Sequence, residues 1–285
     1  MTAAGERLAH FQPAARLLHR LETGAAERAP AVMIVAAHPD DEVIGAGAQL
    51  PRLKELTIVH TTDGAPRDRR DANAAGYGSW ETYASARRGE LAAALPLAGV
   101  PVAAARTLAF ADPGASFHLV ELTQTLAAIV EERRQEVVIT HPYEGGHPDH
   151  DATAFAVHAA CAQLARRGRQ PPALVEMTSY HAGEVGLVTA RFLPRPEIEV
   201  TTLVLHAHAR ARKRELVACF ATQRRVLAQF TLEVERFRPA PSYDFAQPPH
   251  AGRLYYESFD WGVDGARWRE LARAALESLG LGGAS

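Results

Sequence analysis

The chain has 285 residues, of which 47% are hydrophobic and 22% are charged, and its formal net charge is −2. The 31 basic residues are spread among 33 acidic ones rather than gathered in a patch. This distribution argues against a nucleic-acid-binding protein and favours a small-molecule partner. The two cysteines, Cys161 and Cys219, are far apart and outside any CxxC pattern, which argues against a disulfide framework or a cysteine-rich zinc site.

Residues 1–285 suit one large domain, with a leading helix at about 6–22 and a C-terminal lid and helix region at about 238–285. The N-terminal segment lacks the continuous apolar run of a signal peptide, and no later segment is long enough to cross a bilayer. We therefore expect a cytoplasmic protein without a membrane partner. A homo-oligomer stays open, because the leading helix could pack on the core or on a second copy.

Hydrophobic periodicity predicts helices and strands in alternation. The leading helix is amphipathic, with Leu8, Phe11, Ala15, Leu18 and Leu21 at helical spacing. Short apolar runs predict strands at 32–36, 56–61, 107–111, 137–140, 174–179 and 200–205. Helical patterns occupy 42–54, 81–98, 119–135, 151–167 and 207–229. This order predicts an α/β fold of three layers, Rossmann-like, with a mostly parallel sheet that binds ligands at the C-terminal ends of its strands.

Two predicted loops, 63–80 and 238–252, are long for a compact domain and rich in Gly or Pro. Both contain aromatic and basic side chains, namely Arg67, Arg70, Tyr77, Trp80, Tyr243 and His250. Loops of this length are usually lids or disordered, and this mixture favours lids, although surface loops often carry such residues without using them.

Two His-Pro-Asp turns, each closely following a predicted strand, are the most informative feature of the sequence. The first, A-A-H-P-D-D-E, spans residues 36–42, and the second, G-H-P-D-H-D, spans 146–151. In both turns the proline suits the first position of a helix. The histidine and the residue three positions later are then expected on one face of the opening turn. A parallel sheet could bring the two turns together.

The residue types in these turns suit a metal site. His38, Asp41 and His150 would supply two imidazoles and a carboxylate, a set suited to a catalytic Zn²⁺ with one coordination position left for water. Asp40 would then be free to act as a base. The simpler alternative is that Asp40 and Asp41 cap a helix and complement its dipole. Capping needs no histidine and no second copy of the pattern, so the pair of turns favours metal.

The motifs resemble those of the PIG-L/LmbE-like zinc-dependent N-deacetylases, in which A-H-x-D-D is followed much later by H-P-D-H. Three further matches occur in family order: Thr62-Asp63-Gly64 with T-D-G, Arg87 and Glu90 with R-x-x-E, and Lys213 and Gln223 with a late K…Q helix. Together the matches cover about three quarters of the chain, which is more specific than any one motif.

The resemblance implies a role for each matched residue. The implied metal ligands are His38, Asp41 and His150. The implied catalytic residues are Asp40 as general base, His147 as electrophile and acid, and Asp149, which would orient His147. The implied substrate-binding residues are Arg87 and Asp112.

Some positions fall outside the resemblance. The stretch H-P-Y-E-G-G at 141–146 departs from the family pattern, so no gating role is assigned to Tyr143. His141 ends a strand and could support the site as a hydrogen-bond donor. Trp261 and Trp268 are expected to be packing residues rather than sugar platforms.

The resemblance further implies a hydrolase that removes the acetyl group from an N-acetylglucosamine-type glycoside or glycoconjugate and releases acetate and a free amine. Zn²⁺, or alternatively Fe²⁺, would be the cofactor. A metal-dependent amidase of a non-sugar N-acyl molecule and a non-hydrolytic ligand-binding member stay open as alternatives.

A dinucleotide-binding protein is a more distant alternative. Gly45 and Gly47 follow a strand, and Asp63 lies at the spacing of a ribose-binding acid. However, the strand-to-helix turn where the first glycine should lie is filled by His38–Asp41.

Overall fold

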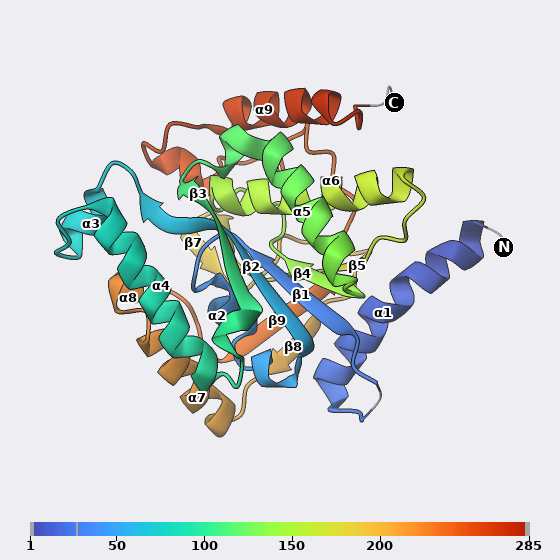
Figure 1. Cartoon of the computed structure of the whole chain (residues 1–285), viewed down its shortest axis with the longest axis horizontal. Helices are drawn as coiled ribbons and strands as arrows, with labels where there is room; N and C mark the ends of the chain where they lie inside the picture. The colour runs from blue at the N-terminus through green and yellow to red at the C-terminus, as the bar shows by residue number, and fades with distance from the viewer. Residues whose placement is uncertain (1–2, 27, 283–285) are drawn as a thin grey trace.

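The computed structural model describes residues 3–26 and 28–282. In this part of the chain, seven strands form one sheet in the order β3-β2-β1-β4-β5-β9-β8 (Figure 1). The strands are β1 (Ala31–Ala36), β2 (Lys54–Pro66), β3 (Ala105–Asp112), β4 (Val137–Thr140), β5 (Ala173–Met177), β8 (Thr201–Val204) and β9 (Val234–Pro239). The five strands β3, β2, β1, β4 and β5 run parallel to one another, and β9 runs antiparallel to both β5 and β8. The predicted three-layer α/β fold with a mostly parallel sheet is confirmed.

Helices cover both faces of the sheet (Figure 1). One face carries α1 (Ala3–Thr23), α2 (Asp41–Ala46), α4 (Trp80–Leu97) and α7 (Ala207–Ala218). The other carries α5 (Leu119–Arg133), α6 (Pro148–Arg166) and α9 (Gly265–Ser278). Successive residues of β1 point to opposite faces, so Val32 and Ile34 join the first cluster while Met33 and Val35 join the second. Burial on both faces explains the uninterrupted apolar runs.

The leading helix α1 packs against β5, β8 and β9. Among residues 12–23, where its side chains are described, Ala14, Leu17, Leu18 and Leu21 are buried. The predicted apolar face is therefore wrong at Ala15, which is exposed. The side chains of Leu8 and Phe11 lie outside the described residues.

Two predicted helices are too long. The one predicted at 42–54 ends at Ala46 and is followed by a 3₁₀ turn at Leu50–Arg52. Two glycines and Pro51 disfavour a longer helix. The one predicted at 207–229 breaks after Ala218 into a 3₁₀ turn (Ala221–Gln223) and the short helix α8 (Arg224–Leu227). Here the side chain of Glu90 accepts hydrogen bonds from both the backbone N and Oγ1 of Thr222, a tertiary contact that no local pattern reveals.

Three strands of the structure, β6 (Tyr180–Gly183), β7 (Gly186–Thr189) and β9, were not predicted. β9 pairs with a strand on each side but contains three charged residues, of which Glu235 and Arg238 are buried in ion pairs. β6 and β7 form a hairpin beside the sheet.

Both predicted loops are partly structured. β2 extends to Pro66, and α3 (Arg70–Ala74) lies within the segment predicted as a loop at 63–80. The segment predicted at 238–252 begins inside β9. Within residues 3–26 and 28–282, no helix combines the length and the hydropathy of a membrane-spanning segment.

Candidate active site and metal centre

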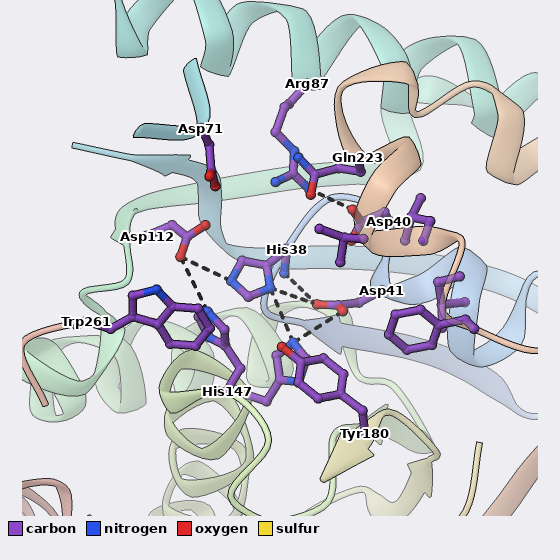
Figure 2. Close-up of a pocket in the computed structure, with 15 residues that line it drawn as sticks. His38, Asp40, Asp41, Asp71, Arg87, Asp112, His147, Tyr180, Gln223 and Trp261 are labelled. Atoms are coloured by element: carbon purple, nitrogen blue, oxygen red, sulfur yellow. Dashed lines mark hydrogen bonds and ion pairs between the residues drawn. The ribbon is translucent and has the colours of Figure 1, made fainter. Parts of the chain in front are cut away.

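The two His-Pro-Asp turns meet at one edge of the sheet. β1 and β4 are parallel neighbours, with Val32 opposite Val137, so both turns follow strands that end at the same edge. β3, two strands away from β1, places Asp112 beside them. Figure 2 shows His38 between Asp41 on one side and Asp112 and His147 on the other. The site thus lies where the fold predicts a ligand.

Three side-chain groups converge in the geometry of a metal site. His38 Nδ1 lies 3.4 Å from Asp41 Oδ2 and 3.3 Å from His150 Nε2. His150 Nε2 lies 3.3 Å from Asp41 Oδ1. All the candidate ligand atoms of these residues lie within 4.8 Å of one another. Two imidazole nitrogens and a carboxylate around one point form a donor set that fits a divalent metal ion such as zinc.

Neighbouring groups hold these ligands in place. Ser179 Oγ lies 3.0 Å from His150 Nδ1. The ring of His141 stacks on His150 with 4.0 Å between centroids and 3° between planes. His141 Nε2 accepts the Ala37 N–H at 3.0 Å and lies 3.3 Å from Asp41 Oδ2. His141 therefore supports two of the candidate ligands, as such outer contacts do in metal sites.

Asp149 does not contact His147 in the predicted way. Its Oδ1 accepts the Gly114 and Ala115 N–H groups at 3.1 and 3.0 Å, and its Oδ2 lies 3.6 Å from His38 Nε2. The backbone N–H of Asp149, not its carboxylate, donates to His147 Nδ1 at 3.1 Å. The reason is that His147 is the N-cap of α6, and a cap side chain accepts from the first turn.

This contact fixes which nitrogen of His147 carries hydrogen. Because Nδ1 accepts, neutral His147 has its proton on Nε2, which lies 3.8 Å from Asp112 Oδ1. Burial, reinforced by nearby His38, holds the pKa of His147 well below its usual value. His147 is thus a neutral imidazole whose Nε2–H points toward the cavity side of Asp112.

Asp40 is not a helix cap. Although it stands at the N-cap of α2, its side chain makes no capping hydrogen bond with any described residue. Its φ of 134° is unusual for a non-glycine residue, a kind of strain that clusters at functional sites. Asp40 Oδ2 instead accepts Arg87 Nη2 at 2.8 Å. Burial raises the pKa of Asp40 to about 8, against the opposing charge of Arg87.

Arg87 hydrogen-bonds to protein atoms around Asp40. It is 3% exposed, and it also donates to Pro39 O at 2.7 Å and to Gly64 O at 2.6 Å. A Cβ at Gly64 would lie 2.6 Å from Arg87 Nη1, so the glycine of the T-D-G motif makes room for the guanidinium. Arg87 lines the cavity, as predicted for a substrate-binding residue, but its hydrogen bonds suit a residue that positions Asp40.

Lys213 and Gln223, which match the late K…Q helix of the family, stabilise the surroundings of the site. Lys213 Nζ donates to Ile44 O of α2 at 2.6 Å and to Glu235 Oε1 of β9 at 2.7 Å. Gln223 donates to Tyr83 Oη at 2.6 Å and lines the cavity.

The cavity in front of these groups has a volume of about 140 Å³. Its acidic and basic lining comes from Asp71, Arg87 and Asp112, and its apolar lining from Ile44, Val226, Leu227 and Phe230. The same cavity is lined by Tyr180 and Trp261, which extend toward it in Figure 2. No local sequence signal marks Asp71 of α3 or Tyr180 of β6, because both elements reach the cavity only through tertiary packing.

The two tryptophans differ in their surroundings. The prediction that Trp261 is a packing residue is wrong, because its ring lines the cavity, lies 4.5 Å from that of His147 and stacks on Phe259. Trp268 is fully buried, as predicted for a packing residue, and stacks on Tyr143. Tyr143 is itself 3% exposed and donates to Gln247 O at 2.9 Å, which makes it a core residue rather than a gate.

Comparison with known proteins agrees with this geometry. The family model described as PIG-L, GlcNAc-PI de-N-acetylase, matches residues 33–161, a range that contains both His-Pro-Asp turns. A probable N-acetyl-alpha-D-glucosaminyl L-malate deacetylase 2 of Bacillus anthracis is 32% identical over 165 residues, which is 54% of this chain and 70% of that protein. The chain belongs to the PIG-L family.

Other members and structures are consistent with this assignment. A protein of the same description from Bacillus cereus is 27% identical over 159 residues, covering 54% of this chain and 71% of that protein. A deacetylase–bog complex from the teicoplanin biosynthesis pathway superposes with a TM-score of 0.57 at 20% identity, covering 75% of this chain and 98% of that one, and shows the shared fold. The predicted family and reaction class, a metal-dependent hydrolytic N-deacetylase, are confirmed.

Proposed function

We propose that the protein is a zinc-dependent deacetylase of a small N-acetylglucosamine glycoside or glycoconjugate, with His38, Asp41 and His150 as the zinc ligands. The convergence of these three side chains, with Asp40 and His147 beside them in one cavity, carries the proposal. The relatives' names support the sugar, since both are described as N-acetyl-alpha-D-glucosaminyl L-malate deacetylases.

Asp40 would act as the general base. A zinc ion held by the three ligands would act as a Lewis acid and lower the pKa of a water molecule bound to it to about 7. Asp40 takes a proton from the attacking water, and a carboxylate whose pKa burial raises to about 8 is better matched to this task near neutral pH than an ordinary one. Arg87 holds Asp40 Oδ2 and so directs the carboxylate into the cavity.

His147 would stabilise the charge that develops on the acetyl oxygen. Its Nε2–H would donate a hydrogen bond to that oxygen, and Asp40 would return the proton that it took from water to the leaving nitrogen. The Asp149 backbone N–H fixes the tautomer that makes this possible. The Asp149 carboxylate, between the Gly114 and Ala115 amides and His38 Nε2, would position the ligand His38.

The cavity lining supports a sugar as substrate. Asp112 and Asp71 offer acceptors for hydroxyl or amine hydrogens on one side. Trp261 presents an aromatic ring beside His147, against which an apolar face of a pyranose could stack.

Amine release from N-acetylglucosamine, its malate glycoside and other glycosides tests the proposal. The zinc-loaded, iron-loaded and chelated enzymes and Asp40→Asn are compared under one set of conditions. We expect metal-dependent release that Asp40→Asn lowers by at least about a hundredfold. Turnover of non-sugar N-acyl amines in place of these sugars would contradict the substrate, and substrate binding without turnover in the metal-loaded enzyme would contradict the activity.

A further inference from the structure

A groove adjoins the catalytic cavity between α3 and residues 221–229, the segment that contains α8. The groove and the cavity share three lining residues, Asp71, Gln223 and Val226. Figure 1 shows α3 and α8 on the same side of the molecule. The further apolar and aromatic lining of this α3–α8 groove comes from Ala74, Ala75, Tyr77, Tyr83, Ala221 and Ala228.

The sizes of the two spaces indicate that a glycoside extends beyond the catalytic cavity. The cavity has a volume of about 140 Å³, whereas the α3–α8 groove has a volume of about 810 Å³. Pockets that enclose a small organic ligand commonly have about 300–1,000 Å³. The cavity therefore has room for the acetamido group and the part of the sugar next to it, and the remainder of a glycoside must lie outside. The adjoining groove is large enough to take that remainder.

The lining of the groove suits a planar apolar group. Its four alanines leave room, because each side chain is a single methyl group. Tyr77 is half-buried, and its ring lies 5.6 Å from the ring of Tyr83, with 63° between the planes. Tyr83 is held in turn by Gln223, which donates to its Oη. This packing fixes an aromatic ring at the groove, and Val226, which is 49% exposed, adds apolar surface where the groove meets the cavity.

The charges around this junction disfavour an anionic ligand. Asp71 lines both spaces, and Asp112 also lines the catalytic cavity. The guanidinium of Arg87 in the cavity wall already donates to a carboxylate and to two backbone carbonyls of the protein. Arg224 and Arg225 of the groove are exposed to solvent, where pairing with a carboxylate stabilises little. A dicarboxylate such as malate would therefore meet like charge next to the sugar.

We propose that the α3–α8 groove binds the aglycone of the substrate, and that this aglycone is an uncharged aromatic group rather than one that carries carboxylates. The inference rests on the proposed function, because it places the acetylated sugar in the catalytic cavity. The aglycone stacks on Tyr77 and contacts Val226 and the alanines, while the acetamido group reaches Asp40 and His147. Tyr77 thus has a role in substrate binding, and it belongs to the segment 63–80 whose composition predicts a lid.

Amine release from three substrates tests the chemical class of the aglycone. N-acetylglucosamine, its malate glycoside and its naphthyl glycoside are compared with the metal-loaded full chain. We expect kcat/KM for the naphthyl glycoside to exceed that for each of the other two by at least about tenfold, because contacts in the groove add binding energy. Equal values for all three substrates, or a preference for the malate glycoside, would overturn the inference and leave the proposed function intact. No release from any of the three would overturn the proposed function itself.

Substitutions in the groove test where the aglycone lies. Ala228→Phe fills the groove, and Ala266→Phe, at an exposed position of α9, is the matched control. The ratio of kcat/KM for the naphthyl glycoside to that for N-acetylglucosamine should fall at least about tenfold in Ala228→Phe and keep its wild-type value in Ala266→Phe. Tyr77→Ala should lower the same ratio at least about threefold, whereas Tyr77→Phe, which keeps the ring, should retain it. An unchanged ratio in Ala228→Phe, or equal ratios in the two Tyr77 variants, would overturn the inference.

Discussion

Burial shifts the pKa of the two side chains that we propose as the base and as the hydrogen-bond donor of the reaction. It raises the pKa of Asp40 to about 8 and holds that of His147 well below its usual value. Both shifts disfavour the charged form, as desolvation does. Asp40 is therefore a base with high proton affinity, and His147 is a neutral imidazole with its hydrogen on Nε2. The same cavity thus raises the pKa of one group and lowers that of the other.

Replacing Arg87 should change the pH dependence of catalysis. The guanidinium favours the charged form of Asp40 and so lowers its pKa, opposing the larger effect of burial. In Arg87→Gln the pKa of Asp40 rises, a smaller fraction of the base is deprotonated at each pH, and the acidic limb of the kcat profile moves to higher pH by about 1 unit or more. Arg88→Gln, at the exposed neighbouring position, is the control. A limb that stays in place in Arg87→Gln contradicts the proposed pairing.

At the scale of elements, the site depends on the loops that leave β1 and β4. The loop after β4 packs against β6 and the segment before α9: Gly146 lies against Tyr180 O, and Gly145 against the side chain of Leu254. α2, which begins at Asp41, is tied to β9 by Lys213 and Glu235. These contacts come from the second half of the chain, so the C-terminal elements hold the N-terminal motif in place.

Alanine at Gly146 should disturb the loop that positions His147. A Cβ there overlaps the carbonyl oxygen of Tyr180, so the backbone must move. We expect a loss of about 1–3 kcal/mol of unfolding free energy and a lower kcat. Gly89→Ala is the matched control, since Gly89 lies in α4 with no atom within 4 Å of its added Cβ, and should gain about 0.5–1 kcal/mol. Denaturant titration and kcat measure both, and equal effects of the two substitutions would refute the steric argument.

Removing the buried amine of Lys213 should destabilise the protein. Lys213→Met leaves the carboxylate of Glu235, which is 1% exposed, without its charged partner. Breaking a buried ion pair from one side costs about 3–5 kcal/mol. Lys54→Met, at an exposed position of β2, should change the free energy by no more than about 0.5 kcal/mol. Urea unfolding of the two variants gives the comparison, and a cost below about 1 kcal/mol for Lys213→Met would show that the pair is not needed.

In the whole molecule, the site joins segments far apart in sequence. Candidate ligands and catalytic groups come from the turn after β1, the start of α2, the end of β3 and the start of α6, and the cavity wall includes Tyr180 and Trp261. A ligand that binds all these segments at once binds the folded chain and not the unfolded one. Metal occupancy is therefore linked to global stability.

Chelation should lower the unfolding temperature, and zinc should raise it. At a free zinc concentration about 100 times the dissociation constant, the gain is about 2.7 kcal/mol. Asp41→Asn, which removes the carboxylate ligand, should lose most of this response while remaining folded without metal. Calorimetry with and without chelator measures the effect. An identical midpoint for the chelated and zinc-loaded wild type would be incompatible with His38, Asp41 and His150 as the metal site.

Local signals were sufficient for much of the fold. β4 was predicted at 137–140, where it lies, because a strand buried on both faces is a continuous apolar run. The two His-Pro-Asp turns located the C-terminal edge of the sheet, since turns after parallel neighbouring strands end at one edge. β9 was missed because Glu235 and Arg238 are buried, and their partners, Lys213 and Glu176, are distant in sequence.

Periodicity and motif spacing are properties of the local chain, so they were sufficient to predict the alternation of strands and helices, the family, and the residues that gather at the sheet edge. Long-range packing set which partner each of those residues has. It placed the Asp149 carboxylate against His38 rather than His147, Arg87 against Asp40, His141 on His150, and Trp261 in the cavity wall. These pairings depend on side-chain direction and on long-range packing, which spacing along the sequence does not specify.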